Sequence, residues 1–138
     1  MIKICLDKLD EAVIWQKPNA STNSIGNLIL HLCGNITQYG IASLEGLEDS
    51  RNRDKEFETL SGFSKQELFQ KLQETVKKAK ASFSNTSEAE LVRKREVQGF
   101  EFSGIGNIVH VVEHFSYHTG QIALWTKILN DADLGFYD

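Results

Sequence analysis

The sequence contains little that would interrupt helices or cross-link the chain. Its 138 residues include a single proline and two cysteines, Cys5 and Cys33. Two cysteines so placed form neither a disulfide framework nor a Cys-x-x-Cys metal pair, so we interpret both as packing residues and expect a cytoplasmic protein. Apolar runs fall far short of the roughly 20 residues that span a bilayer, and the N-terminus has no apolar core of signal-peptide length. We therefore expect no membrane partner.

Positive charge is also in short supply. The formal net charge is −4, and the one basic cluster, Lys77-Lys78-Ala79-Lys80, is balanced by nearby acids. Because binding to phosphates needs a clustered basic face, we expect no nucleic-acid partner. The hydrophobic content of 41% and the charged content of 25% are ordinary for a globular protein, and the length predicts one domain over residues 1–138.

Apolar residues recur at helical spacing along most of the chain. They predict an all-α protein whose main helices cover residues 2–16, 24–46, 64–83 and 103–130. The first helix is short, with a kink near Asp10, and ends before Pro18. The second helix is apolar on more than one side, which is typical of a central helix. Together with the long fourth helix, it indicates an antiparallel four-helix bundle.

Two connections between these helices are long. Residues 47–63 are highly charged and form either an excursion over the surface or a functional loop. Residues 92–102 form either a short hairpin around Gln98-Gly99 or an irregular crossover that is long enough to cross the bundle. Ser64 and Glu67 between them match a capping box, which predicts where the third helix begins.

Three of the four histidines, His110, His114 and His118, lie in the last predicted helix at a spacing of four residues. Because four residues is just over one helical turn, successive imidazoles stack on one side of the helix, and a pair can bind one metal ion. At about 100° per residue, His118 falls in the middle of the apolar stripe, His114 to one side of it and His110 at its margin. The alternative is a pair of hydrogen-bonded core histidines. A metal site needs a third ligand.

The fourth histidine, His31, lies in the second predicted helix. The main apolar stripe of that helix comprises Ile25, Leu28, Ile29, Leu32, Ile36, Tyr39 and Ser43. His31 lies off this stripe, next to Asn35, so periodicity alone makes it a flank residue. The pattern does not show that His31 faces the other histidines.

Three stretches of the chain resemble the DinB-like (YfiT-like) superfamily of metal-dependent proteins, within which the best likeness is to a branch of small bacterial proteins. They are NSIGNLILHLCGN at 23–35, RNRDKEF at 51–57 and VEHFSYHTGQI at 112–122. The likeness extends from about Leu9 to Leu129, and the histidine motifs occur in the order that the superfamily has.

The resemblance implies a four-helix bundle of up-down-down-up topology. It also implies a divalent ion, nickel or zinc, held by one histidine of the second helix and two of the last, which match His31, His114 and His118. Some members are S-transferases that attach a low-molecular-weight thiol to an electrophile, and dimers are common. The implied partners are therefore a small-molecule substrate, a thiol and a second copy of the chain.

The chain departs from the superfamily at its start, because members usually begin with a longer first helix. The missing length leaves a strip of the bundle uncovered, which a partner chain or the C-terminal tail would have to bury. The tail, residues 132–138, ends on the apolar pair Phe136-Tyr137, and we expect this pair to dock on the bundle.

Three neutral imidazoles leave a divalent ion with an open position, which is typical of a catalytic site. Such an ion lowers the pKa of a bound water or thiol. Our leading hypothesis is a metal-dependent enzyme that transfers a low-molecular-weight thiol to small electrophiles. A metal-dependent small-molecule hydrolase is the second hypothesis. The third is a non-catalytic metal-binding module for stress response or interaction, in which His110 or a carboxylate fills the fourth position.

Five further residues are candidates to contact a ligand or to support the metal ligands, namely Asn35, Gln121, His110, Arg53 and Asp54. Asn35 and Gln121 each lie one turn from an expected metal ligand and can orient a bound water or ligand. The pattern leaves open whether the charged residues, with Arg51, fold over the site or only solvate a loop.

Overall fold

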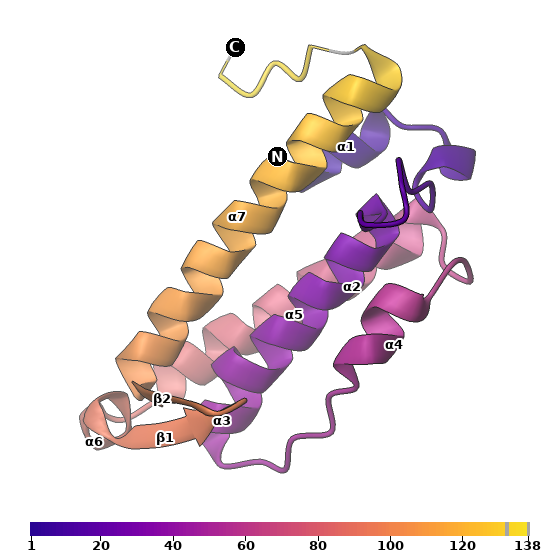
Figure 1. Ribbon diagram of the computed structural model, residues 1–138. Helices are drawn as coiled ribbons and strands as arrows, with labels where there is room; N and C mark the ends of the chain where they lie inside the picture. Colours follow the sequence, from indigo (N-terminus) through magenta and orange to yellow (C-terminus); the bar gives the residue numbers. More distant parts are fainter. Residues whose placement is uncertain (132, 138) are drawn as a thin grey trace.

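The protein is mainly helical, with one small hairpin of two strands (Figure 1). The structure, a computed structural model, describes residues 1–131 and 133–137. Its elements are α1 (Ile2–Asp7), a 3₁₀ turn (Glu11–Val13), α2 (Ile25–Asn35), a π-helical segment (Ile36–Ala42), α3 (Ser43–Glu45), α4 (Arg53–Glu58), α5 (Lys65–Asn85), α6 (Glu88–Val92), β1 (Lys94–Val97), β2 (Phe100–Ser103) and α7 (Gly104–Asn130). The expected helical class is confirmed, whereas the up-down-down-up order of four helices stays a prediction.

Helix α2 is central, because α5, α7 and α4 all pack against it, while α1 packs on the C-terminal part of α7 (Figure 1). Serines begin the three long helices: Ser24, Ser64 and Ser103 precede α2, α5 and α7, and each side chain accepts a hydrogen bond from the backbone N–H three residues on. Such a cap stabilises a helix by about 1 kcal/mol. The capping box of Ser64 and Glu67 is present as expected.

The first helix is shorter than the 2–16 that we expected. Helix α1 ends at Asp7, and only a 3₁₀ turn follows it. The chain turns here because the carbonyl of Ile14 accepts a hydrogen bond from the N–H of Gly26, with 2.9 Å between nitrogen and oxygen. This contact draws the segment onto the first turn of α2 and buries the side chains of Leu9 and Ile14.

Helix α2, the π-helical segment and α3 form one rod, as expected for residues 24–46. Gly46 ends it in the left-handed region, with φ of 68°, which glycine adopts without strain. Buried residues occupy every side of α2 because three helices surround it. The interpretation of His31 as a flank residue is therefore wrong: its side chain faces the interior, and the residue is only 5% exposed.

The charged segment 47–63 contains helix α4, which Asn52 caps. The side-chain amide of Asn27, fully buried in α2, donates to the backbone carbonyls of Glu56 at 2.9 Å and Thr59 at 2.6 Å. These bonds attach α4 to α2, alongside which it lies in Figure 1. Part of the segment is therefore folded against the bundle and does not run over the surface as a solvated loop.

Residues 94–103 form the hairpin that was one of the two alternatives for this connection. Strands β1 and β2 are antiparallel, with Val97 opposite Phe100. Gln98 and Gly99 between them have φ of 53° and 80°, as expected for a tight two-residue turn. Helix α6 packs closely on the start of α7, where a Cβ added to Gly104 would lie 2.3 Å from the carbonyl oxygen of Glu90.

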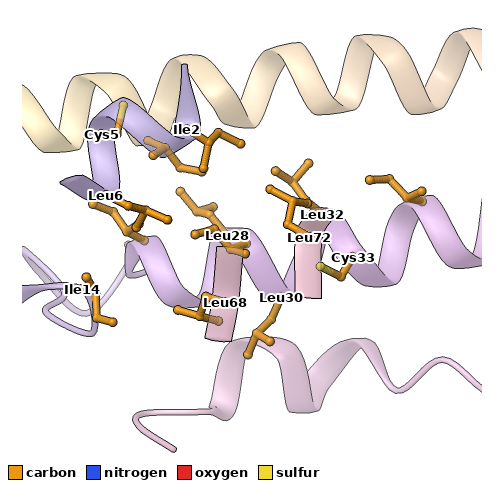
Figure 2. Close-up of a cluster of buried hydrophobic side chains, with 14 of the residues drawn as sticks. Ile2, Cys5, Leu6, Ile14, Leu28, Leu30, Leu32, Cys33, Leu68 and Leu72 are labelled. Atoms are coloured by element: carbon orange, nitrogen blue, oxygen red, sulfur yellow. The ribbon is translucent and has the colours of Figure 1, made fainter. Parts of the chain in front are cut away.

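The apolar core lies between α1, α2, α5 and α7 (Figure 2). It includes Cys5 and Cys33, which are free and buried, as their interpretation as packing residues requires. Full burial of a large apolar side chain such as Leu68 contributes about 1.5–3 kcal/mol. In the described parts of the chain, no helix is long and apolar enough to cross a membrane.

The tail docks in part. Leu134 is buried and Phe136 packs on the core, whereas Tyr137 is 93% exposed. The expectation for the apolar pair therefore holds for Phe136 and is wrong for Tyr137. The first and last residues of the predicted tail, Ala132 and Asp138, lie outside the described residues.

Candidate metal centre

Three imidazoles from two helices meet inside the protein. His31 comes from α2, and His114 and His118 come from consecutive turns of α7. One nitrogen from each ring lies within 4.8 Å of those of the other two. The Nε2 atoms of His31 and His114 are 2.9 Å apart. The ring centroid of His31 is 4.9 Å from that of His114 and 5.0 Å from that of His118.

A carboxylate supports His31 on the far side of its ring. Oε2 of Glu56 is 2.9 Å from Nδ1 of His31. Arg51 donates to both oxygens of the same carboxylate, from Nε at 2.8 Å and from Nη2 at 2.9 Å. Nη2 is also 3.1 Å from Nδ1 of His31, but an Nδ1–H that donates to Glu56 satisfies all three groups. His31 then presents the lone pair of Nε2 to the other histidines.

The carboxylate of Glu56 is charged. Burial alone would raise its pKa, but the hydrogen bonds from Arg51 and His31 outweigh burial and lower the pKa below its ordinary value. Gly34 makes room for this ion pair on the surface of α2, because an added Cβ would lie 1.9 Å from Oε1 of Glu56 and 2.8 Å from Nε of Arg51. The ion pair therefore packs directly on the helix backbone.

His118 is held from its own helix. Its Nδ1 is 2.6 Å from Oε1 of Gln121. Because an amide oxygen only accepts hydrogen bonds, Nδ1 carries the proton, and Nε2 is left with a free lone pair. Gln121, expected to support the site, thus fixes the tautomer of His118.

The rings of α7 are neutral at pH 7. Burial, together with the nearness of His118 and His31, lowers the pKa of His114 to about 3. Burial also lowers the pKa of His118, although the hydrogen bond with Gln121 opposes this change. The neutral imidazole is the form that binds metal ions.

His110 lies outside the cluster. Its Nε2 is 3.1 Å from Nδ2 of Asn35, and its ring centroid is 4.3 Å from that of Tyr39. Burial lowers its pKa as well. Asn35, one turn after His31, therefore contacts His110, and its side chain forms no hydrogen bond with a ring of the cluster.

The charged segment divides into inward and outward residues. Arg51 folds over the site, and Arg53 lies at its edge, with its guanidinium carbon 5.0 Å from the ring centroid of Phe57. Asp54 is exposed in the first turn of α4, where a negative charge suits the helix N-terminus. Sequence reasoning did not single out Glu56. The available signal was Asn52, a capping residue that predicts a helical turn here.

The donor set fits a divalent ion. Zinc sites place each histidine nitrogen about 2.0–2.1 Å from the ion, which puts tetrahedral ligands about 3.3 Å apart. The nitrogen separations here, 2.9 Å for one pair and within 4.8 Å for all, lie around that value. Histidine-only sites take nickel, zinc or copper, so the donors suit a divalent ion without selecting one.

Comparison with known proteins places the chain in a family. The family model described as Protein of unknown function (DUF1572) matches residues 1–136. The crystal structure of a DinB-like protein (YjoA) from Bacillus subtilis is similar, with a TM-score of 0.72 and 18% sequence identity over 99% of this chain and 89% of that chain. No curated protein matches the chain. The mainly helical fold expected from the resemblance is thus confirmed: the chain has the DinB-like fold and belongs to the DUF1572 family.

Proposed function

We propose that the protein is a metal-dependent enzyme that transfers a low-molecular-weight thiol to small electrophiles, with nickel or zinc held by His31, His114 and His118. The observation that carries the proposal is the meeting of these three rings, two of which have Nδ1 held by Glu56 and Gln121. The transfer of a thiol is inferred from the resemblance to the DinB-like superfamily, because the geometry defines a metal site without defining the transferred group.

The surroundings of the cluster support an enzyme over a non-catalytic module. Three nitrogens leave an ion at least one position for another ligand. His110, which would fill that position in a module, has its Nε2 on Asn35, and Glu56 is held by Arg51. Within residues 1–131 and 133–137, no fourth His, Cys, Asp or Glu joins the group.

The chain's own residues prepare the site. Glu56 and Gln121 fix the tautomers of His31 and His118, and burial keeps the rings of α7 neutral. A bound divalent ion would supply Lewis acidity, which lowers the pKa of a thiol. In the transfer, the thiol loses its proton to solvent, its sulfur forms a bond to the electrophilic carbon, and the leaving group departs with the electron pair of the broken bond.

The test uses protein purified without an affinity tag, loaded with zinc or nickel, and 1-chloro-2,4-dinitrobenzene as the electrophile. L-cysteine, glutathione and coenzyme A serve as thiols, and chloride leaves as the thioether forms. We expect a metal-dependent rate above that of thiol and electrophile alone. His118→Ala should abolish it, and Glu113→Ala, an exposed change on the same helix, should not.

Two other outcomes would replace the proposal. Metal-dependent hydrolysis of 4-nitrophenyl acetate without any thiol, with no thioether formed from any of the three thiols, would make the protein a hydrolase. Bound metal with neither activity would leave the non-catalytic module. Equal metal content in the wild type and His118→Ala would contradict the proposed metal site itself.

We also propose that a second copy of the chain covers the strip left by the short α1. A groove of about 920 Å³, lined largely by apolar side chains, runs between α5 and α7 beside Met1 and Ile2. Val112 on its border is 60% exposed, and a Cβ added to Gly120 would meet nothing within 4 Å, so another helix can approach closely. A face of this kind is typical of interfaces.

Light scattering after gel filtration tests the dimer. The wild type should have about twice the 15.6 kDa of one chain. Val112→Lys should shift it to the monomer, because the new charge would be buried beside Lys77 and Lys80 of the same groove, which is costly, while Lys127→Glu, on an exposed position of α7, should not. A wild-type monomer throughout the micromolar range would contradict this proposal and leave the metal site untouched.

A further inference from the structure

A pocket of about 290 Å³ opens beside the metal centre, between α2, α7 and the hairpin. His31 and His114 form part of its wall, so a molecule in the pocket lies next to the position of the ion. Arg53 of α4 and Phe102 of β2 contribute other parts of the wall. The pocket is thus built by segments that are far apart in the sequence. Residues other than the metal ligands therefore also determine which ligand it binds.

One side of the pocket is a series of nearly parallel rings that leads to the cluster. The planes of Phe100 and Phe102 differ by 12°, with centroids 6.2 Å apart. The plane of His110 differs from that of Phe102 by 19° and from that of His114 by 25°, at centroid distances of 6.1 Å and 5.4 Å. Phe100 is 59% exposed, although it is a large apolar side chain. A wall of this kind favours a planar ring, which stacks on aromatic faces.

The pocket is positively charged. Arg51 is neutralised by Glu56, but Arg53 has no carboxylate within ion-pair distance among the described residues. The described residues that line the pocket include no Asp and no Glu. A bound divalent ion would add two further positive charges. The excess favours an anionic ligand, and a guanidinium pairs well with a carboxylate.

The inner wall carries an acceptor that has no partner. Asn35 is 4% exposed and lines the pocket; its Nδ2 faces His110, and its Oδ1 has no hydrogen-bond partner. Leaving a buried polar atom unpaired is costly. Because this oxygen is itself buried, it is not exposed to the pocket, and the case for a ligand rests on the rings and the charge.

We propose that this pocket binds the electrophilic substrate, and that the substrate is a small aromatic carboxylate. Its ring lies along the wall that contains Phe102 and His110, and its carboxylate pairs with Arg53. The inference rests on the proposed function for the reaction that follows binding. Binding itself is measured without thiol and without turnover, so the two can fail separately.

The experiment is titration calorimetry with three probes: 4-nitrobenzoate, its neutral analogue 4-nitrobenzamide, and acetate. Zinc-loaded protein is compared with protein stripped by a chelator, since a carboxylate cannot coordinate an ion that has been removed. We expect 4-nitrobenzoate to bind both forms about tenfold more tightly than either of the other probes, because it alone has both ring and charge.

Two substitutions in α4 test whether Arg53 pairs with the carboxylate. Arg53→Gln should remove the preference for 4-nitrobenzoate over 4-nitrobenzamide and leave the zinc content unchanged. Lys55→Gln removes the same charge from an exposed position outside the pocket wall and should preserve the preference. Phe102→Leu should weaken both aromatic probes about equally and leave acetate unaffected.

The pocket assignment is overturned if 4-nitrobenzoate and 4-nitrobenzamide bind equally to the wild type, if Arg53→Gln keeps the preference, or if no aromatic probe binds at millimolar concentration. Intact binding with no thiol transfer would instead overturn the proposed function and leave the pocket. Thiol transfer with no preference for the carboxylate would do the reverse.

Discussion

His110 and His118 lie on the same helix, each four residues from His114, yet their surroundings differ. His118 is 8% exposed and its ring centroid is 5.0 Å from that of His31. His110 is half-buried, with its Nε2 on Asn35. Both rings have a lowered pKa because of burial. Spacing, chemistry and charge state are thus alike at the two positions, and only one of them joins the cluster.

The difference lies in which residue of the neighbouring rod, the helical residues 25–45, lies opposite each histidine. His31, Asn35 and Tyr39 are themselves four residues apart, and this row faces the row of α7 in the opposite direction. His31 lies opposite the pair that forms the cluster, whereas Asn35 and Tyr39 lie opposite His110. A histidine becomes a candidate ligand where the facing helix supplies another nitrogen, and a hydrogen-bonded wall residue where it supplies an amide.

Replacing His118 or His110, which lie on either side of His114 in α7, should give the largest difference in the affinity for zinc. His118→Ala should lower the affinity for zinc by more than about a hundredfold, since loss of a ligand exceeds the 10–100-fold that loss of a supporting group costs. His110→Ala should change it by less than about threefold. Metal content measured by mass spectrometry on tag-free protein checks both. Equal losses in the two variants would show that His110 is a ligand and break the comparison.

The second contrast concerns the support of the cluster from α4. Glu56→Gln keeps the shape of the side chain but removes the charge that favours Nδ1–H on His31, so the affinity for zinc should fall about tenfold or more. Glu58→Gln, an exposed change on the same helix, is the matched control. Competition with a chromophoric chelator measures both. An unchanged affinity in Glu56→Gln would mean that packing alone orients His31.

Two glycine substitutions should affect different properties, because one lowers the affinity for zinc and the other raises the stability of α7. Gly34→Ala would bring Cβ against Oε1 of Glu56, displace the carboxylate from His31 and lower the affinity for zinc several-fold. Gly120→Ala places its Cβ in open space within one chain, so in a monomeric variant it should stabilise α7 by up to about 1 kcal/mol with no effect on zinc. Chelator competition and chemical denaturation separate the two effects. Zinc affinity unchanged by Gly34→Ala would show that Glu56 finds another position of equal use.

The last prediction concerns the pH dependence of the metal-free protein. His114 has a pKa of about 3 when folded and near 6.5 when unfolded, so the unfolded chain binds the proton more readily between these values. The free energy of unfolding should therefore fall as the pH drops from about 6.5 towards 3, with no contribution from this group above 6.5. Thermal unfolding at pH 7.5, 6 and 5 should show a falling Tm, and His114→Gln should flatten it. An equal slope in both proteins would assign the pH dependence to other groups.

Much of the fold could be predicted from local patterns. The rod over 24–46, the capping box at Ser64 and the turn at Gln98-Gly99 depend on contacts within a few residues, which periodicity and turn chemistry report directly. The first helix was predicted too long, because the turn that shortens it depends on a backbone hydrogen bond between Ile14 and Gly26, the second residue of α2.

The site likewise has a part that local patterns predicted and a part that they could not predict. The spacing of the histidines in α7 correctly predicted that His118 points inward and that His110 lies at the margin. It could not predict the direction of His31, because a helix surrounded by three others is buried on every side and leaves no stripe to read. Nor could it predict Glu56, since a charged residue in a charged segment has no periodic signal.

The sequence by itself determined the three long helices, their caps and the placing of two imidazoles on one face of α7, because these follow from backbone geometry repeated every few residues. Only the tertiary structure decided that His31 meets them, that Glu56 and Arg51 support it, and that His110 faces Asn35. The contacts of His31 with Glu56 and His114, and of His110 with Asn35, join residues 25 to 83 positions apart. They arise only when α2, α4 and α7 pack together to bury their apolar sides.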